Sequence, residues 1–235
     1  MIQQLEEENI VKELLRLRAR ISERFPTSGL LKVCTDLLRV GETTSRRVRA
    51  ASRPNLLLRS FVIIVLAGGI AAQIGAARYL EYFDLFQGAS TAELTQALES
   101  IVNLFILAGA AIWFLLTLEA REKRGFILKH LHELRSFAHV IDMHQLTKDP
   151  MAMSSSATRT ASSPDRNMSP YELSRYLDYC SEMLALTGKL AACYGERTRD
   201  TEVIAAVNDI ETMTTGMGRK IWKKIMMIGD EHLQH

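Results

Sequence analysis

The sequence predicts an all-α membrane protein, in which two transmembrane helices form a hairpin and the N- and C-terminal segments build a cytoplasmic helical bundle. Three observations predict this fold class. Two long blocks of the chain are apolar and uncharged. Apolar residues elsewhere recur at helical spacing. Lys and Arg are frequent on the outer sides of the two blocks but rare between them.

The two apolar blocks cover residues 60–77 and 101–118, and their sequences are SFVIIVLAGGIAAQIGAA and IVNLFILAGAAIWFLLTL. As a helix, each block would extend about 27 Å, close to the thickness of the hydrocarbon core of a bilayer. The first block is not a signal peptide, because it follows a long segment with an acidic start. We therefore expect a two-span hairpin over residues 56–119.

Small and polar residues within the blocks predict helix packing in lipid. Gly68, Ala72 and Ala76 repeat every four residues and lie on one face of a helix, which favours a close packing seam. This seam could join the two spans or two subunits. Gln73 and Asn103 are expected to face another helix or a lumen, because a polar side chain facing lipid costs free energy.

The distribution of basic residues predicts the orientation. Between the blocks, Arg78 is the only Lys or Arg before residue 101, whereas each outer flank has five: Arg46, Arg47, Arg49, Arg53 and Arg59 before the first block, and Arg121, Lys123, Arg124, Lys129 and Arg135 after the second. Basic residues are retained on the cytoplasmic side. We expect both termini in the cytoplasm and an integral membrane protein of the bacterial inner membrane, with an organelle membrane as the alternative.

The N-terminal region, residues 1–55, is predicted to contain two cytoplasmic helices and a basic juxtamembrane stretch. The first helix covers residues 2–24, and the second covers residues 30–40. In the basic stretch RRVRAASRPN, the candidates for binding anionic lipid headgroups are Arg46, Arg47, Arg49 and Arg53. The alternative is that these residues only signal topology.

After the second block, an apolar stripe predicts that the span continues through residues 120–148 as one helix that ends near Thr147. A Ser-rich flexible linker is expected over residues 149–169. Ser169 and Pro170 mark a helix start, as N-cap and first helical residue. Residues 170–235 then form a C-terminal helical hairpin, in which Gly195 ends the first helix.

The end of the last helix is a candidate site for lipid or a protein partner. Its segment GRKIWKKIMMIG places Lys220, Trp222, Lys223 and Lys224 in a basic amphipathic pattern. Such a segment can lie on a membrane surface or in a partner's groove. The alternative is a core helix whose cations complement the helix dipole.

Catalytic and metal-binding patterns are weak in this chain. His132, His139 and Asp142 lie on one helix face and are the weak candidates for a metal site, but the two His are about 10 Å apart along the helix. The alternative is a polar seam in which His139 bonds Asp142. Phosphate-binding Gly loops and hydrolase motifs are absent, and the three Cys lack metal or disulfide spacing. We expect no enzymatic activity and no cofactor.

These observations favour a membrane-anchored helical interaction protein that works as a self-associating scaffold or sensor. The alternative is a small oligomeric ion channel or membrane-permeabilising effector gated by its cytoplasmic helices. The short acidic loop between the spans resembles the arrangement in mitochondrial calcium uniporters, but YLEYFDLFQG replaces their WDIME-type signature, so no residue is carried over. Expected partners are membrane lipids, further copies of the chain and a protein on the C-terminal helices. A net charge of +2 gives no basic field for nucleic acid.

Overall fold

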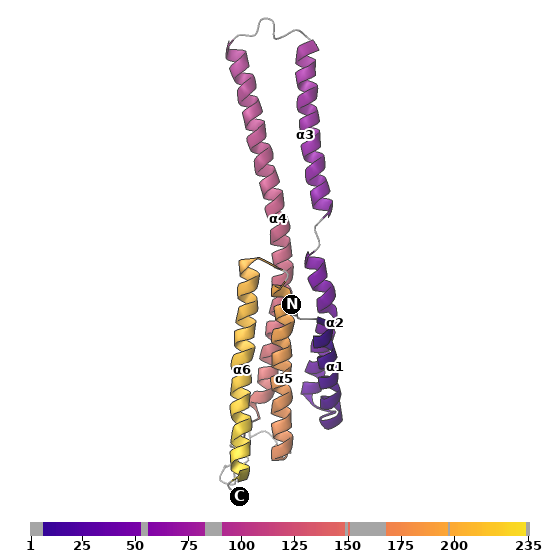
Figure 1. Cartoon of the computed structure of the whole chain (residues 1–235), viewed down its shortest axis with the longest axis vertical. Helices are drawn as coiled ribbons and strands as arrows, with labels where there is room; N and C mark the ends of the chain where they lie inside the picture. Colours follow the sequence, from indigo (N-terminus) through magenta and orange to yellow (C-terminus); the bar gives the residue numbers. More distant parts are fainter. Residues whose placement is uncertain are drawn as a thin grey trace, which may run out of the picture. The chain divides into compact units, whose positions relative to one another are not determined.

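The computed structural model describes residues 7–52, 56–82, 91–148, 150, 168–196 and 198–233, and it contains no strand among them (Figure 1). The described part of the chain is therefore all-helical, as predicted. The helices are α1 (Glu7–Arg24), α2 (Gly29–Ser52), α3 (Leu56–Tyr82), α4 (Thr91–Leu146), α5 (Pro170–Gly195) and α6 (Thr201–Leu233). They divide into two compact units, residues 1–52 with 124–235, and residues 53–123.

The first unit is a bundle of α1, α2, the C-terminal part of α4, α5 and α6. The apolar stripes that the sequence predicts on these helices are buried, and they share one hydrophobic cluster. Its largest fully buried side chains include Leu14, Leu134, Leu177 and Met183. Each such side chain stabilises the fold by about 1.5–3 kcal/mol. The N-terminal helices thus share one core with the C-terminal hairpin.

Contacts between side chains give the directions of the helices. Arg20 on α1 binds Glu182 on α5, while Phe25 packs edge-on against Tyr176 at 5.4 Å between ring centroids, so α1 and α5 are antiparallel. On α4, Arg124 binds Asp200 at 2.7 Å, and Gln145 accepts a hydrogen bond from Lys224 at 2.7 Å. The C-terminal part of α4 and α6 therefore run in the same direction.

The second helix is longer than the sequence analysis predicted. It continues past Val40 to Ser52, because the same face goes on burying side chains, Thr44 and Val48 among them. Gly41 does not break the helix. It lies where α2 crosses α1, and a Cβ atom added there would be 3.1 Å from a methyl group of Leu14.

The starts of α5 and α6 are fixed by side-chain caps. Ser169 accepts a hydrogen bond from the Glu172 amide, and the Glu172 carboxylate accepts one from the Ser169 amide, which completes a capping box. The predicted start at Ser169–Pro170 and the predicted end at Gly195 are confirmed. Asp200 caps α6 by accepting from the amides of Glu202 and Val203.

One end of the bundle is where the chain leaves it and returns. Near this end, Arg47 of α2 binds Glu133 of α4 at 2.8 Å, and Arg124 of α4 binds Asp200 between α5 and α6. Residues 52 and 124 therefore lie at the same end of the bundle as the connection between α5 and α6. Residues 53–123 are inserted in the sequence between these two positions.

The second unit contains α3 and the N-terminal part of α4. In the described residues, one stretch is long and apolar enough to cross a membrane by length and composition, Ile101–Leu146, and the most apolar window of this stretch is not buried within the chain. A shorter apolar stretch covers Ser60–Ala72. Helix α4 ends at Leu146, next to the end predicted near Thr147.

Candidate functional site

The surface of the second unit is apolar. Large hydrophobic side chains on α3 and the first part of α4 are exposed, and Leu57, at 85% exposure, is the extreme case. The exposed set on the two helices includes Phe61, Ile63, Ile64, Ile70, Ile74, Phe105, Ile106, Leu107 and Phe114. The bundle has the opposite arrangement, with its apolar stripes inside. A soluble monomer rarely exposes a contiguous apolar surface of this extent.

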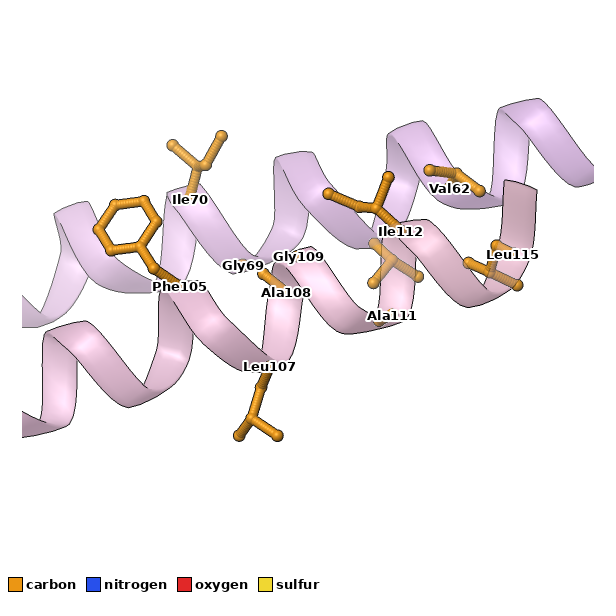
Figure 2. Close-up of a pocket in the computed structure, with 11 residues that line it drawn as sticks. Val62, Gly69, Ile70, Phe105, Leu107, Ala108, Gly109, Ala111, Ile112 and Leu115 are labelled. Carbon is orange, nitrogen blue, oxygen red and sulfur yellow. The ribbon is translucent and has the colours of Figure 1, made fainter. Parts of the chain in front are cut away.

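A groove of about 510 Å³ lies between α3 and the first part of α4 (Figure 2). All eleven lining residues are apolar or glycine. Gly69 and Gly109 lie on opposite sides of the groove, and a Cβ atom added at either would meet no atom within 4 Å. The groove thus offers space and apolar contact but no charged or hydrogen-bonding side chain.

The predicted packing seam does not coincide with this groove. Val62, Val65 and Gly69 line the groove on α3, whereas Gly68 and Ala72 are exposed and are not among the lining residues. A Cβ atom added at Gly68 would meet no atom within 4 Å. The seam between subunits therefore stays a prediction, while the described contacts give no support to a seam between the two helices.

The other predicted residues of the spans are described only in part. Asn103 is exposed. The side chains of Gln73 and Ala76 lie outside the described residues, although α3 includes both positions.

Two of the predicted lipid- or partner-binding residues point into the bundle instead. The Arg47 guanidinium pairs with Glu133 at 2.8 Å, and its side chain is largely covered. The Lys224 ammonium donates to Gln145 Oε1 at 2.7 Å and to the backbone carbonyls of Gln145 and Lys148 at 3.0 and 3.2 Å. It therefore caps the C-terminal end of α4. Both residues are bound within the chain, and their assignment to lipid or a partner stays a prediction.

The remaining residues of that set are exposed wherever the structure describes their side chains. Arg46 is exposed on α2, and Lys220, Trp222 and Lys223 are exposed on α6. The side chain of Arg49 and the whole of Arg53 lie outside the described residues. The candidate surface on α6 therefore consists of Trp222 with its basic neighbours.

The His132, His139 and Asp142 stripe does not form a compact site. Within the described ranges, no group of three or more His, Cys, Asp or Glu side chains is placed to hold a metal ion. His132 and His139 are exposed, and Asp142 accepts a hydrogen bond at 2.7 Å from Gln145. Among the described residues no hydrogen bond joins His139 to Asp142, and the Asp142 carboxylate accepts from Gln145, one turn further along α4.

His144 occupies a more confined position than the predicted histidines. It lies at the end of α4, where a Cβ atom added at Gly29 of α2 would be 2.6 Å from its ring. Its Nδ1 is 3.5 Å from the Tyr176 hydroxyl. Burial and the nearby Lys148 ammonium lower the pKa of His144 below its usual value.

A cluster of arginines and tyrosines lies between α1 and α5 and was not predicted from the sequence. Arg20, Arg24 and Arg175 line a cavity with Glu23 and Tyr179. The guanidinium groups of Arg20 and Arg175 lie 5.7 and 5.2 Å from the centre of the Tyr179 ring. The hydrogen bond from Arg20 to Glu182 raises the pKa of Arg20. No local pattern marks this cluster, since its members are distant in the sequence.

The three cysteines are buried free thiols. Burial raises the pKa of Cys34 to about 11 and that of Cys180 to about 12. A thiol is a nucleophile as the thiolate, so these two side chains are poor candidates for covalent chemistry.

Comparisons with known protein families, characterised proteins and solved structures gave no match to this chain.

Proposed function

We propose that this chain is a membrane-anchored helical interaction protein and not an enzyme. In this proposal residues 56–119 form a two-span hairpin in a bilayer, and both termini are cytoplasmic. The bundle works as a self-associating scaffold or sensor. The bacterial inner membrane is the proposed location, because the basic residues outside the two blocks suit retention in the cytoplasm.

The contrast between the two units is the observation that carries the proposal. The bundle buries its apolar stripes, whereas α3 and the first part of α4 expose theirs. Moving one large apolar side chain out of water is favourable by about 1.5–3 kcal/mol. Since many such side chains are exposed together on the second unit, its transfer from water into lipid is strongly favourable in free energy.

The channel alternative has less support. The groove between α3 and α4 is lined by apolar residues and glycines, with no polar side chain to replace the hydration shell of an ion. Two helices of one copy also do not enclose a pore. Recordings from bilayers that contain the purified protein should show no current above background, and reproducible single-channel events would favour the channel instead.

Membrane insertion can be tested by reconstituting the full chain in vesicles and washing them with alkaline carbonate. We expect the wild-type protein to remain with the lipid. Phe105→Lys combined with Ile106→Lys should release a large fraction, because each Lys at the centre of a span costs about 2.5–3.5 kcal/mol. Met143→Lys is the matched control, since Met143 is exposed at 66% on the bundle.

A wild-type protein that appears in the alkaline supernatant would contradict the anchor. Equal release of the Phe105→Lys/Ile106→Lys and Met143→Lys variants would also contradict it, because the effect would then not depend on the apolar segment.

A further inference from the structure

Helix α6 has a second stripe on the side opposite to its core face. The stripe repeats at alternating intervals of four and three residues, which is the spacing of a helix that pairs with another helix. Its members are all exposed, in contrast to the core residues Val203, Val207, Ile210, Met217 and Ile221 of the same helix. The stripe consists of Thr201, Ala205, Asn208, Thr212, Thr215, Arg219, Trp222 and Met226.

The side chains of this stripe change in size along the helix. The side chains in its first half are small, Ala205 and Thr212 among them. Gly216 lies beside the stripe, and a Cβ atom added there would meet no atom within 4 Å. Its second half is large, with Trp222 at 60% and Met226 at 53% exposure. An exposed Trp next to an exposed Met on a helix that already buries its other face indicates a binding surface.

Charge is also divided between the two halves. Asp209 and Glu211 flank the first half, together with Glu202, which is paired with Arg124. Arg219, Lys220 and Lys223 occupy the second half. In the described part of the chain, Asp209, Glu211 and these three basic residues form no ion pair. Among the described side chains of α6, the exposed face is therefore acidic in the first half of the stripe and basic in the second half.

We propose that α6 is a self-association surface, which pairs in the antiparallel direction with α6 of a second copy. In the register that centres the stripe, Thr212 lies opposite the partner's Thr215, Asn208 opposite the partner's Arg219, and Ala205 opposite the partner's Trp222. The large side chains of one copy then meet the small side chains of the other. The acidic half of each helix lies along the basic half of its partner.

Other occupants explain less of this surface. A parallel pair would place like charges together, which is destabilising. An anionic lipid surface would attract the basic half, but it would repel Asp209 and Glu211 and would not need a stripe of eight residues. The second copy alone complements both halves.

This inference rests on the proposed interaction function, because it names the partner of that function. Since the chain leaves the bundle at the Asp200 end, antiparallel pairing places the two exit points at opposite ends of the pair, so it joins copies anchored in different bilayers and not two copies side by side in one bilayer. The test therefore uses the full chain in detergent micelles, where no single bilayer fixes the relative direction of two copies.

Cysteine cross-linking measures the direction of pairing. Thr201→Cys lies opposite the partner's Met226 in the antiparallel register, and Met226→Cys lies opposite the partner's Thr201. Along one helix these positions are about 37 Å apart. A mixture of the two variants should form a disulfide dimer on mild oxidation, whereas neither variant alone should do so. The wild-type cysteines can stay, because all three are buried.

Charge reversal measures the complementarity. Asp209→Lys with Glu211→Lys, or Arg219→Glu with Lys220→Glu, should each reduce the cross-linked yield by about tenfold or more when both cysteine variants carry it. The yield should be restored in a mixture where one cysteine variant carries Asp209→Lys with Glu211→Lys and the other carries Arg219→Glu with Lys220→Glu. Glu8→Lys with Glu42→Lys on α1 and α2 is the control with the same charge change as Asp209→Lys with Glu211→Lys, and it should leave the yield unchanged.

Cross-linking of Thr201→Cys with itself would show a parallel pair and overturn the proposal. An absence of cross-linking in the mixture, with thermal unfolding unchanged, would overturn it as well. Neither outcome depends on membrane insertion, which the carbonate wash measures separately, so a failure of α6 pairing and a failure of the anchor are distinguishable.

Discussion

Lys223 and Lys224 are adjacent in the chain but have different environments. Lys224 donates hydrogen bonds to the end of α4, where Gln145 is buried, whereas Lys223 is exposed. Lys224→Met should lower the free energy of unfolding of the bundle by about 1–3 kcal/mol, because buried acceptors lose their donor. Lys223→Met should change it by less than about 0.5 kcal/mol. Urea unfolding in detergent, followed by circular dichroism, measures both. Equal effects would show that the cap does not contribute.

His144 predicts a pH dependence of stability. Its pKa in the folded chain is lowered below the usual 6.5 by burial and by Lys148, so the unfolded chain binds a proton at a higher pH. The neutral ring therefore contributes stability above pH 6.5, and this contribution is lost as the pH falls through the folded pKa. We expect a lower melting temperature at pH 5.5 than at pH 7.5.

His144→Gln should make this difference smaller, while His139→Asn, at an exposed position of the same helix, should leave it unchanged. A wild-type melting temperature that does not fall on acidification, or one that falls equally in His144→Gln, would refute the assignment to His144.

At the scale of an element, the crossing of α5 and α6 depends on Gly188. A Cβ atom at this buried position would lie 2.9 Å from the Thr214 hydroxyl oxygen, and Thr214 is itself buried. Gly188→Ala should therefore destabilise the bundle by about 1–3 kcal/mol through overpacking. Gly229→Ala, on the same pair of helices but with open space around it, should be neutral or slightly stabilising. If the Gly188→Ala bundle were more stable than wild type, α6 would be able to move away from the added methyl group at no cost in free energy.

The small-residue face of α3 predicts association of the spans. Gly68→Leu or Ala72→Leu should weaken the oligomer, because Leu keeps a second helix at a distance. Val65 lines the groove with α4 and is therefore not a suitable control. Ala67→Leu is the matched control, since Ala67 is exposed on another side of α3. The oligomeric state is measured by mass in nanodiscs. An oligomer that persists in both Gly68→Leu and Ala72→Leu would show that this face is not the interface.

At the scale of the whole molecule, the distribution of basic residues predicts that the connection between the spans and the Ser-rich linker lie on opposite sides of the membrane. Residues 83–90 of the connection and residues 151–167 of the linker lie outside the described residues. Cysteines introduced as Gln87→Cys and Ser155→Cys should differ in labelling by an impermeant maleimide. Gln87→Cys should react in intact cells, and Ser155→Cys only after permeabilisation. Equal protection of both, or reaction of only Ser155→Cys from outside, would reverse this topology.

The sequence by itself determined the local features of this protein. Helical periodicity identified the buried residues of the bundle, such as Leu134 and Leu177, because spacing along one helix decides which side chains share a face. Ser169 with Pro170 marked the start of α5, since a cap acts within one turn. The apolar composition of residues 60–77 and 101–118 is also a local feature, because it can be read from each segment alone.

Only the tertiary structure decided which contacts those features make. The sequence grouped Lys224 with Lys220 and Lys223, and Arg47 with Arg46. The fold separates them, because Gln145 and Glu133 come close only after the helices pack. Trp222 was a candidate from the sequence, but the full outer stripe of α6 was not, since the joint exposure of Trp222 and Met226 is known only when the core face is filled. Periodicity is a property of one helix, whereas ion pairs, crossings and free surfaces are properties of helices brought together from distant parts of the chain.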